Sequence, residues 1–94
     1  MKFGLSDEIY NEVINIVKKY DYTFKIFGSR ARGNYKYNSD IDIAVYGEIK
    51  KEDKFNISND FDKIDMAYSI DIVFIQDITK EEFLNSINRD GVEL

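Results

Sequence analysis

The spacing of the apolar residues changes several times along the chain, and each change predicts a new element of secondary structure. Between residues 6 and 20 the apolar positions recur every three or four residues, which is the period of a helix buried on one side. Ser6 is a typical N-terminal helix cap, and Lys18-Lys19 suit the last turn. The buried stripe consists of Ile9, Val13, Ile16, Val17 and Tyr20. We therefore predict a first helix that starts after Ser6.

Three short segments have the composition and the period of β-strands. The first is Thr23–Phe27, which is rich in apolar and β-branched residues. The second covers residues 40–46, where apolar and polar positions alternate, and the third is the apolar run at residues 69–75.

Three further helices are predicted between and after these strands. A short helix over residues 29–32 is ended by Gly33, and apolar residues with helical spacing predict another helix over about residues 51–65. Thr79 and Glu82 form a capping-box pattern at the start of the last helix, which stops at Gly91. The order α-β-α-β-α-β-α, without repeats or proline, predicts one α+β domain over residues 1–94.

The composition is that of an ordinary soluble globular protein, with 44% hydrophobic and 33% charged residues. No apolar segment approaches the length of a bilayer span, and the first residues lack the apolar core of a signal peptide. The chain has no cysteine for a disulfide. We expect an intracellular, cytoplasmic protein that does not bind a membrane.

The net charge of −5 is unevenly distributed. Residues 47–94 carry six basic and twelve acidic residues, net −6, whereas residues 21–46 carry four basic and three acidic residues, net +1. No acid interrupts the stretch from Lys25 to Ser39. Positive charge confined to one short stretch of an acidic protein suits a small polyanionic ligand, and makes direct nucleic-acid binding improbable.

Three aspartates lie in the two predicted strands that follow this stretch. Asp40 and Asp42 are two positions apart in a strand, so their carboxylates are expected to project from one face, and Asp71 lies inside the next apolar strand. Acids on apolar strands are unfavourable unless a cation neutralises them, which points to magnesium. Taken one at a time, Asp40 could instead be a turn residue, and Asp42 a strand-edge charge that blocks aggregation, with a similar alternative for Asp71. The chain has no histidine, which excludes a histidine-based catalytic triad and a histidine metal ligand.

A strand that runs into Gly28-Ser29 is a candidate phosphate-binding turn. Backbone N–H groups at such a junction, together with the Ser29 hydroxyl, can approach phosphate oxygens. Arg30 and Arg32 follow directly and would lie near the phosphates, although a solvated surface pair is the alternative for both. An isolated Gly-Ser turn is more often structural than functional, and it is the aspartates downstream that favour a binding turn here.

The motif Gly28–Gly33, followed by Ser39–Asp42 and then Asp71, resembles that of the DNA polymerase beta-like nucleotidyltransferase superfamily, and in particular the minimal nucleotidyltransferases. The resemblance covers nearly the whole chain. It implies a small mixed sheet packed against helices, with two magnesium ions held by Asp40, Asp42 and Asp71. It also implies that ATP is bound at Gly28, Ser29, Arg30, Arg32 and Ser39.

Minimal nucleotidyltransferases are commonly encoded beside a helical HEPN-type ribonuclease toxin and act as its antitoxin. The resemblance therefore implies adenylylation, the transfer of AMP from ATP to a tyrosine of that toxin. Two other functions remain open: an antitoxin that neutralises its partner by binding alone, and a nucleotidyltransferase that modifies a small molecule. Larger relatives carry a substrate-binding extension, and none is evident here, so we expect the acceptor to come from another protein.

Overall fold

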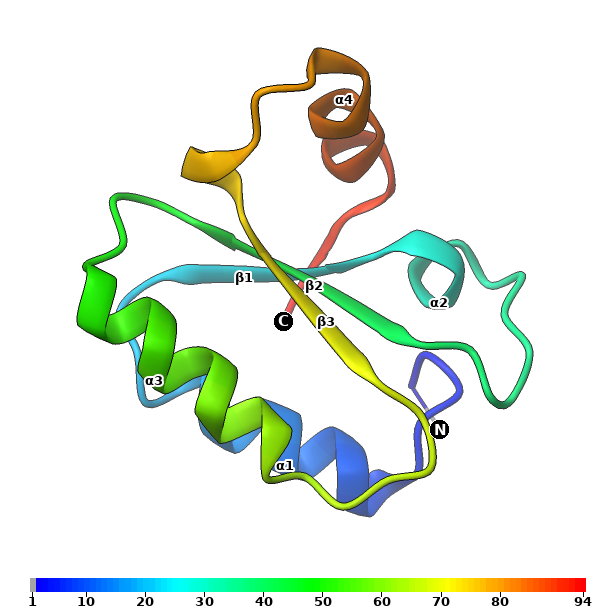
Figure 1. Ribbon diagram of the computed structural model, residues 1–94. Coiled ribbons are helices and arrows are strands. Elements are labelled where there is room, and N and C mark those ends of the chain that lie inside the picture. Colours follow the sequence, from blue (N-terminus) through cyan, green and yellow to red (C-terminus); the bar gives the residue numbers. More distant parts are fainter. Residues whose placement is uncertain (1) are drawn as a thin grey trace.

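The computed structural model describes residues 2–94 as a four-stranded mixed sheet with helices on both faces (Figure 1). Its elements in chain order are α1 (Asp7–Val17), β1 (Thr23–Phe27), α2 (Gly28–Arg32), β2 (Ile41–Tyr46), α3 (Lys51–Asp62), β3 (Ile70–Phe74), the 3₁₀ turn η1 (Ile75–Asp77), α4 (Glu81–Asp90) and β4 (Val92–Glu93). The strands lie in the order β3-β2-β1-β4, with β2 and β3 parallel and the other pairs antiparallel. The predicted α+β class with a small mixed sheet is confirmed.

The two faces of the sheet are covered unequally. In Figure 1, α1 and α3 lie on one face and α4 on the other. Ile41, Ile43 and Val45 of β2 belong to the larger core, which also contains the buried apolar residues of α1 and α3. On the α4 face, the buried residues of the smaller core are Phe27, Ala44 and Ile87. The alternation predicted for the second strand therefore separates two cores of different size.

The first helix begins as predicted but ends earlier. Ser6 caps it, because the Ser6 hydroxyl oxygen accepts a hydrogen bond from the Ile9 N–H at 3.2 Å. The prediction that Lys18 and Lys19 lie in the last turn is wrong, since the helix ends at Val17 and Lys18 is its C-cap. Lys19 instead reaches across to α3.

Two later helix boundaries also differ from the prediction. Helix α3 ends at Asp62 instead of residue 65, because the chain turns there and buries Ile64 in the larger core. The capping box at Thr79 and Glu82 is wrong: Lys80 is the N-cap, and its carbonyl accepts the Leu84 N–H at 3.1 Å. Thr79 is therefore one residue too early in the chain to cap this helix.

The sequence pattern did not predict the last strand. Gly91 ends α4 as expected, and β4 then pairs antiparallel with β1 at Lys25 and Ile26. A strand of two residues is too short to show a period. Among residues 2–94, no helix combines the length and the apolar character needed to cross a bilayer.

Candidate active site

Gly28 lies at the junction where β1 continues directly into α2. Its φ of 74° is in the left-handed region, which favours glycine. A Cβ atom at this position would overlap the carboxylate of Asp42. Position 28 therefore requires glycine for two reasons: the left-handed backbone conformation and the close approach of the Asp42 carboxylate. Ser29, the next residue of α2, is half-buried at the same junction.

Asp42 and Asp71 are direct neighbours across the sheet. They form a register pair between the parallel strands β2 and β3, so both side chains project from the same face. This is the face that carries Ala44 and α4. Asp42 is half-buried and Asp71 is exposed. The expectation that these two acids lie together is met by the strand register.

Asp40 lies one residue before β2 instead of inside the strand. Its carboxylate oxygen Oδ1 accepts a hydrogen bond from the backbone N–H of Ser69 at 3.2 Å, and the Ser69 carbonyl accepts the Ile41 N–H at 2.9 Å. Asp40 therefore helps to join the start of β2 to the start of β3. Within residues 2–94, no group of three or more acidic side chains is gathered closely enough to hold a metal ion as it stands.

The acids nevertheless affect one another electrostatically. Burial raises the pKa of Asp42 above its ordinary value, and the negative charges of Asp71 and Asp40 raise it further. The positive charge of Arg32 acts in the opposite direction. Asp42 thus ionises at a cost, because it is partly desolvated and faces two like charges.

Arg32 lies close enough to Asp42 to influence its ionisation and is also tied to the last helix. Its Nη1 is 3.1 Å from the Oδ2 of Asp90, at the end of α4. Arg89 also donates a hydrogen bond to Asp90, and these bonds lower the pKa of Asp90. The Arg32 side chain remains 44% exposed, so a ligand can reach it. The sequence pattern did not suggest the role of Asp90.

Arg30 lies elsewhere, in the interior of the protein. It is only 1% exposed, and its guanidinium donates hydrogen bonds to the backbone carbonyls of Phe3, Tyr37 and Ser39. This placement does not support the expected contact of Arg30 with phosphates, and it also excludes the alternative of a solvated surface arginine. The carbonyl of Ser39 accepts hydrogen bonds from Arg30, and the hydroxyl oxygen of Ser39 accepts one from the Lys36 N–H at 2.9 Å. Ser39 therefore helps to shape the loop that leads to Asp40.

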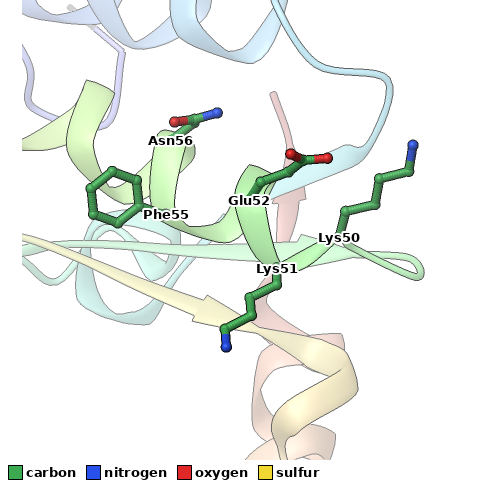
Figure 2. A pocket seen from close by; sticks show the side chains of 5 residues that line it. All are labelled: Lys50, Lys51, Glu52, Phe55 and Asn56. Carbon is green, nitrogen blue, oxygen red and sulfur yellow. The ribbon is translucent and has the colours of Figure 1, made fainter.

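One hollow on the described part of the protein lies away from these aspartates, at the start of α3. It measures about 660 Å³ and lies over the first turns of α3 (Figure 2). It is lined by Lys50, Lys51, Glu52, Phe55 and Asn56, whose side chains spread apart in Figure 2 instead of converging. The hollow follows the end of β2, whereas Asp42 lies near the start of this strand, so the volume of a hollow does not identify the candidate site. A smaller hollow of about 360 Å³ is lined partly by Asp71 and Ser69.

The sequence matches the family described as polymerase beta, nucleotidyltransferase, over residues 11–94. The chain belongs to this nucleotidyltransferase family. The match contains the Gly28 turn and all three aspartates, so the candidate site lies inside the family domain. Among curated proteins, none matches the sequence significantly.

Solved structures show the same fold. A toxin-antitoxin crystal structure with AMP-PNP superposes with a TM-score of 0.67 at 19% identity, over 88% of this chain and 69% of that one. A mutant of the MntA-HpeT toxin-antitoxin gives a TM-score of 0.66 at 19% identity, over 90% and 70%. A Sulfolobus solfataricus protein assigned as a nucleotidyltransferase gives 0.53 at 24%, over 92% and 76%. At these identities the likeness shows the nucleotidyltransferase fold.

The chemistry of the donors at this end of the sheet suits a divalent cation, although within residues 2–94 the carboxylates are not gathered closely enough to hold one as they stand. Carboxylate oxygens are the ligands that Mg²⁺ prefers, and Asp42 and Asp71 are adjacent on one face. Burial first, and then the negative charges of Asp71 and Asp40, raise the pKa of Asp42, and a bound cation would offset the repulsion between these charges. Asp40, two residues before Asp42, is the remaining candidate ligand.

Proposed function

We propose that this protein is a magnesium-dependent nucleotidyltransferase that transfers AMP from ATP to a tyrosine hydroxyl of a HEPN-type toxin and thereby acts as its antitoxin. The observation that carries the proposal is the register pair Asp42–Asp71 beside Gly28. Membership of the nucleotidyltransferase family supports the reaction class. The likeness to toxin-antitoxin structures, one of them with AMP-PNP, supports the nucleotide and the kind of partner.

On the nucleotide side, the turn after β1 would receive the phosphates. Gly28 leaves the space in which the Asp42 carboxylate lies next to the backbone, and Ser29 offers its hydroxyl and N–H to phosphate oxygens. Arg32, held by Asp90, would present positive charge to the triphosphate while the pair stays partly exposed. These groups would orient ATP with its α-phosphate towards Asp42.

On the acceptor side, Asp71 is the exposed acid nearest to Asp42 along the sheet. In the proposed step the tyrosine oxygen attacks the α-phosphorus, and the bond from that phosphorus to the bridging oxygen of the β-phosphate breaks. Pyrophosphate leaves, and the hydroxyl proton passes to a carboxylate oxygen of Asp71 and then to water. Magnesium held by Asp40, Asp42 and Asp71 would neutralise charge on the phosphoryl oxygens and make the hydroxyl more acidic.

The proposal is tested with a HEPN-type toxin as the candidate partner. A substoichiometric amount of the protein, with ATP and magnesium, should raise the mass of the toxin by whole AMP units. The toxin should stay inactive after the protein is removed. Asp71→Ala should stop the mass change, whereas Asp77→Ala, an exposed acid outside the site, should leave it unchanged.

A binding antitoxin would behave differently in the same experiment. It would require stoichiometric amounts, work without ATP, and release an active toxin on dissociation, because occlusion lasts only as long as the complex. Full neutralisation by Asp71→Ala without any change in the mass of the toxin would replace the enzymatic proposal by this one. Transfer of AMP to a small molecule but not to the toxin would instead indicate a small-molecule nucleotidyltransferase.

A further inference from the structure

We propose that Arg30 is a positioning residue that sets the spacing of the three aspartates from inside the protein. The inference concerns how the site is held in place, and its catalytic part rests on the proposed function. Arg30 itself would touch neither nucleotide nor acceptor, because its guanidinium is buried and already bonded to the backbone.

Arg30 connects three segments that are far apart in the sequence. Its Nε and Nη2 donate to the Ser39 carbonyl at 2.9 and 2.7 Å, and Nη2 also donates to the Tyr37 carbonyl at 3.1 Å. Its Nη1 donates to the Phe3 carbonyl at 3.0 Å. The guanidinium carbon lies 4.6 Å from the ring centre of Tyr68. One side chain therefore joins the N-terminal turn, the loop before β2 and the segment before β3.

Each of the last two segments leads directly to an acid of the site. The Ser39 carbonyl belongs to the peptide bond that continues into Asp40, so the hydrogen bonds from Arg30 restrain the residue just before this acid. Tyr68 precedes Ser69, whose N–H bonds to the Asp40 carboxylate and whose carbonyl bonds to the Ile41 N–H. Movement of Arg30 would thus shift the start of β2 and the start of β3 relative to each other.

The N-terminal turn that accepts a hydrogen bond from Arg30 has an unusual backbone conformation. Phe3 and Gly4 have φ values of 56° and 70°, and the Leu5 N–H bonds to the Lys2 carbonyl at 2.9 Å. The ring of Tyr35 packs so closely on Gly4 that a Cβ atom on residue 4 would overlap the ring. The centre of the same ring lies 5.3 Å from the guanidinium carbon of Arg30. The guanidinium therefore has aromatic rings from two different segments within cation–π distance.

Only arginine has the geometry for this role. Its planar fork can serve several carbonyls at once while aromatic rings stack on its faces, whereas the lysine ammonium is a single charged point that prefers water. Arg30→Lys keeps the charge but should leave some of the three carbonyls without a donor. It is therefore a sharper test than the removal of the whole side chain.

The first measurement is amide hydrogen exchange in the protein without ligands. Arg30→Lys should speed exchange at Ile41, whose N–H joins β2 to Ser69, on the order of tenfold relative to Val45 at the far end of β2. Val13→Ala removes packing from α1 in the larger core, and should change both amides together. An equal change at Ile41 and Val45 in Arg30→Lys would overturn the inference.

The second measurement is AMP transfer with kcat and KM determined separately. Arg30→Lys should lower kcat on the order of 10- to 100-fold with little change in KM for ATP, because small displacements of reacting groups slow the chemical step strongly. Tyr68→Phe should resemble the unmodified protein because it keeps the ring face, whereas Tyr68→Leu should resemble Arg30→Lys. Val13→Ala, assayed well below its melting temperature, should keep its kcat.

The two proposals can fail independently. If the unmodified protein transfers no AMP, the proposed function is wrong, and the exchange data alone decide the role of Arg30. If the unmodified protein is active and Arg30→Lys keeps both its kcat and the slow exchange at Ile41, the positioning role is wrong while the proposed function stands. A loss of kcat in Val13→Ala equal to that in Arg30→Lys would reduce Arg30 to a purely structural residue.

Discussion

Asp42→Asn is expected to stabilise the metal-free protein, although it removes a residue of the proposed site. Asp42 and Asp71 are register neighbours on adjacent strands, which places their side chains about 5 Å apart. Two unit charges at that distance repel by about 0.8 kcal/mol in water and by about 3 kcal/mol at an effective dielectric constant of ~20. Asp42 is only half-buried and Arg32 opposes the repulsion, so the lower part of this range applies.

We therefore expect Asp42→Asn to raise the free energy of unfolding by about 1 kcal/mol at pH 7. For a domain of this size, that corresponds to an increase of about 4–8 °C in melting temperature. The assay is thermal unfolding followed by circular dichroism in the presence of a chelator. Asp65→Asn, an exposed loop residue, changes the net charge equally and should leave the melting temperature nearly unchanged.

The pH dependence gives a second test of the same reasoning. Burial raises the pKa of Asp42 above the ordinary value of 3.8, so the folded state binds this proton more tightly than the unfolded state. The destabilisation is present at neutral pH, shrinks as the pH falls through the raised pKa, and is absent below 3.8. The advantage of Asp42→Asn should follow this course. A lower melting temperature for the variant at pH 7, or an advantage independent of pH, would refute the argument.

Three more predictions follow from the site and its support. Gly28→Ala should destabilise the protein by about 1–3 kcal/mol and weaken ATP binding, because alanine is strained at a φ of 74° and its Cβ would overlap Asp42; melting curves and calorimetric titration check both effects. ATP should bind at least about tenfold more tightly with magnesium than with a chelator, a difference of about 1.4 kcal/mol, because the acids otherwise repel the triphosphate. Equal affinities in calorimetric titrations would contradict the proposed metal site. Ile87→Ala should lower the free energy of unfolding by about 2–5 kcal/mol in urea titrations, since Ile87 is the fully buried residue of α4. A change below about 1 kcal/mol would contradict this packing.

The sequence predicted the structural features that depend on residues close together in the chain. The cap at Ser6, the alternation in β2 and the glycine after β1 are local signals, and the structure confirms each of them. The pairing of Asp42 with Asp71 required knowledge of the strand register, which the family resemblance implied and the spacing alone could not supply.

The sequence could not predict what depends on distant residues. The bond acceptors of Arg30 come from residues 3, 37 and 39, and no local pattern distinguishes it from the exposed Arg32 two positions later. The partner of Arg32 is Asp90, 58 positions away. Thr79 failed as a cap for a related reason, because the conformation after η1 decides where α4 starts.

The unequal division of the two cores implies an order in which parts of the protein open. Helix α4 rests on the smaller core, where Ile87 is its one fully buried residue, whereas α1 and α3 share the larger core. Local opening should therefore require less free energy at α4 than elsewhere, and a protease should cut near Lys80 or Arg89 before it cuts the rest of the chain. Asp90 belongs to α4, so each such opening would break the ion pair between Asp90 and Arg32. The electrostatic surroundings of Asp42 would therefore fluctuate with the local opening of α4.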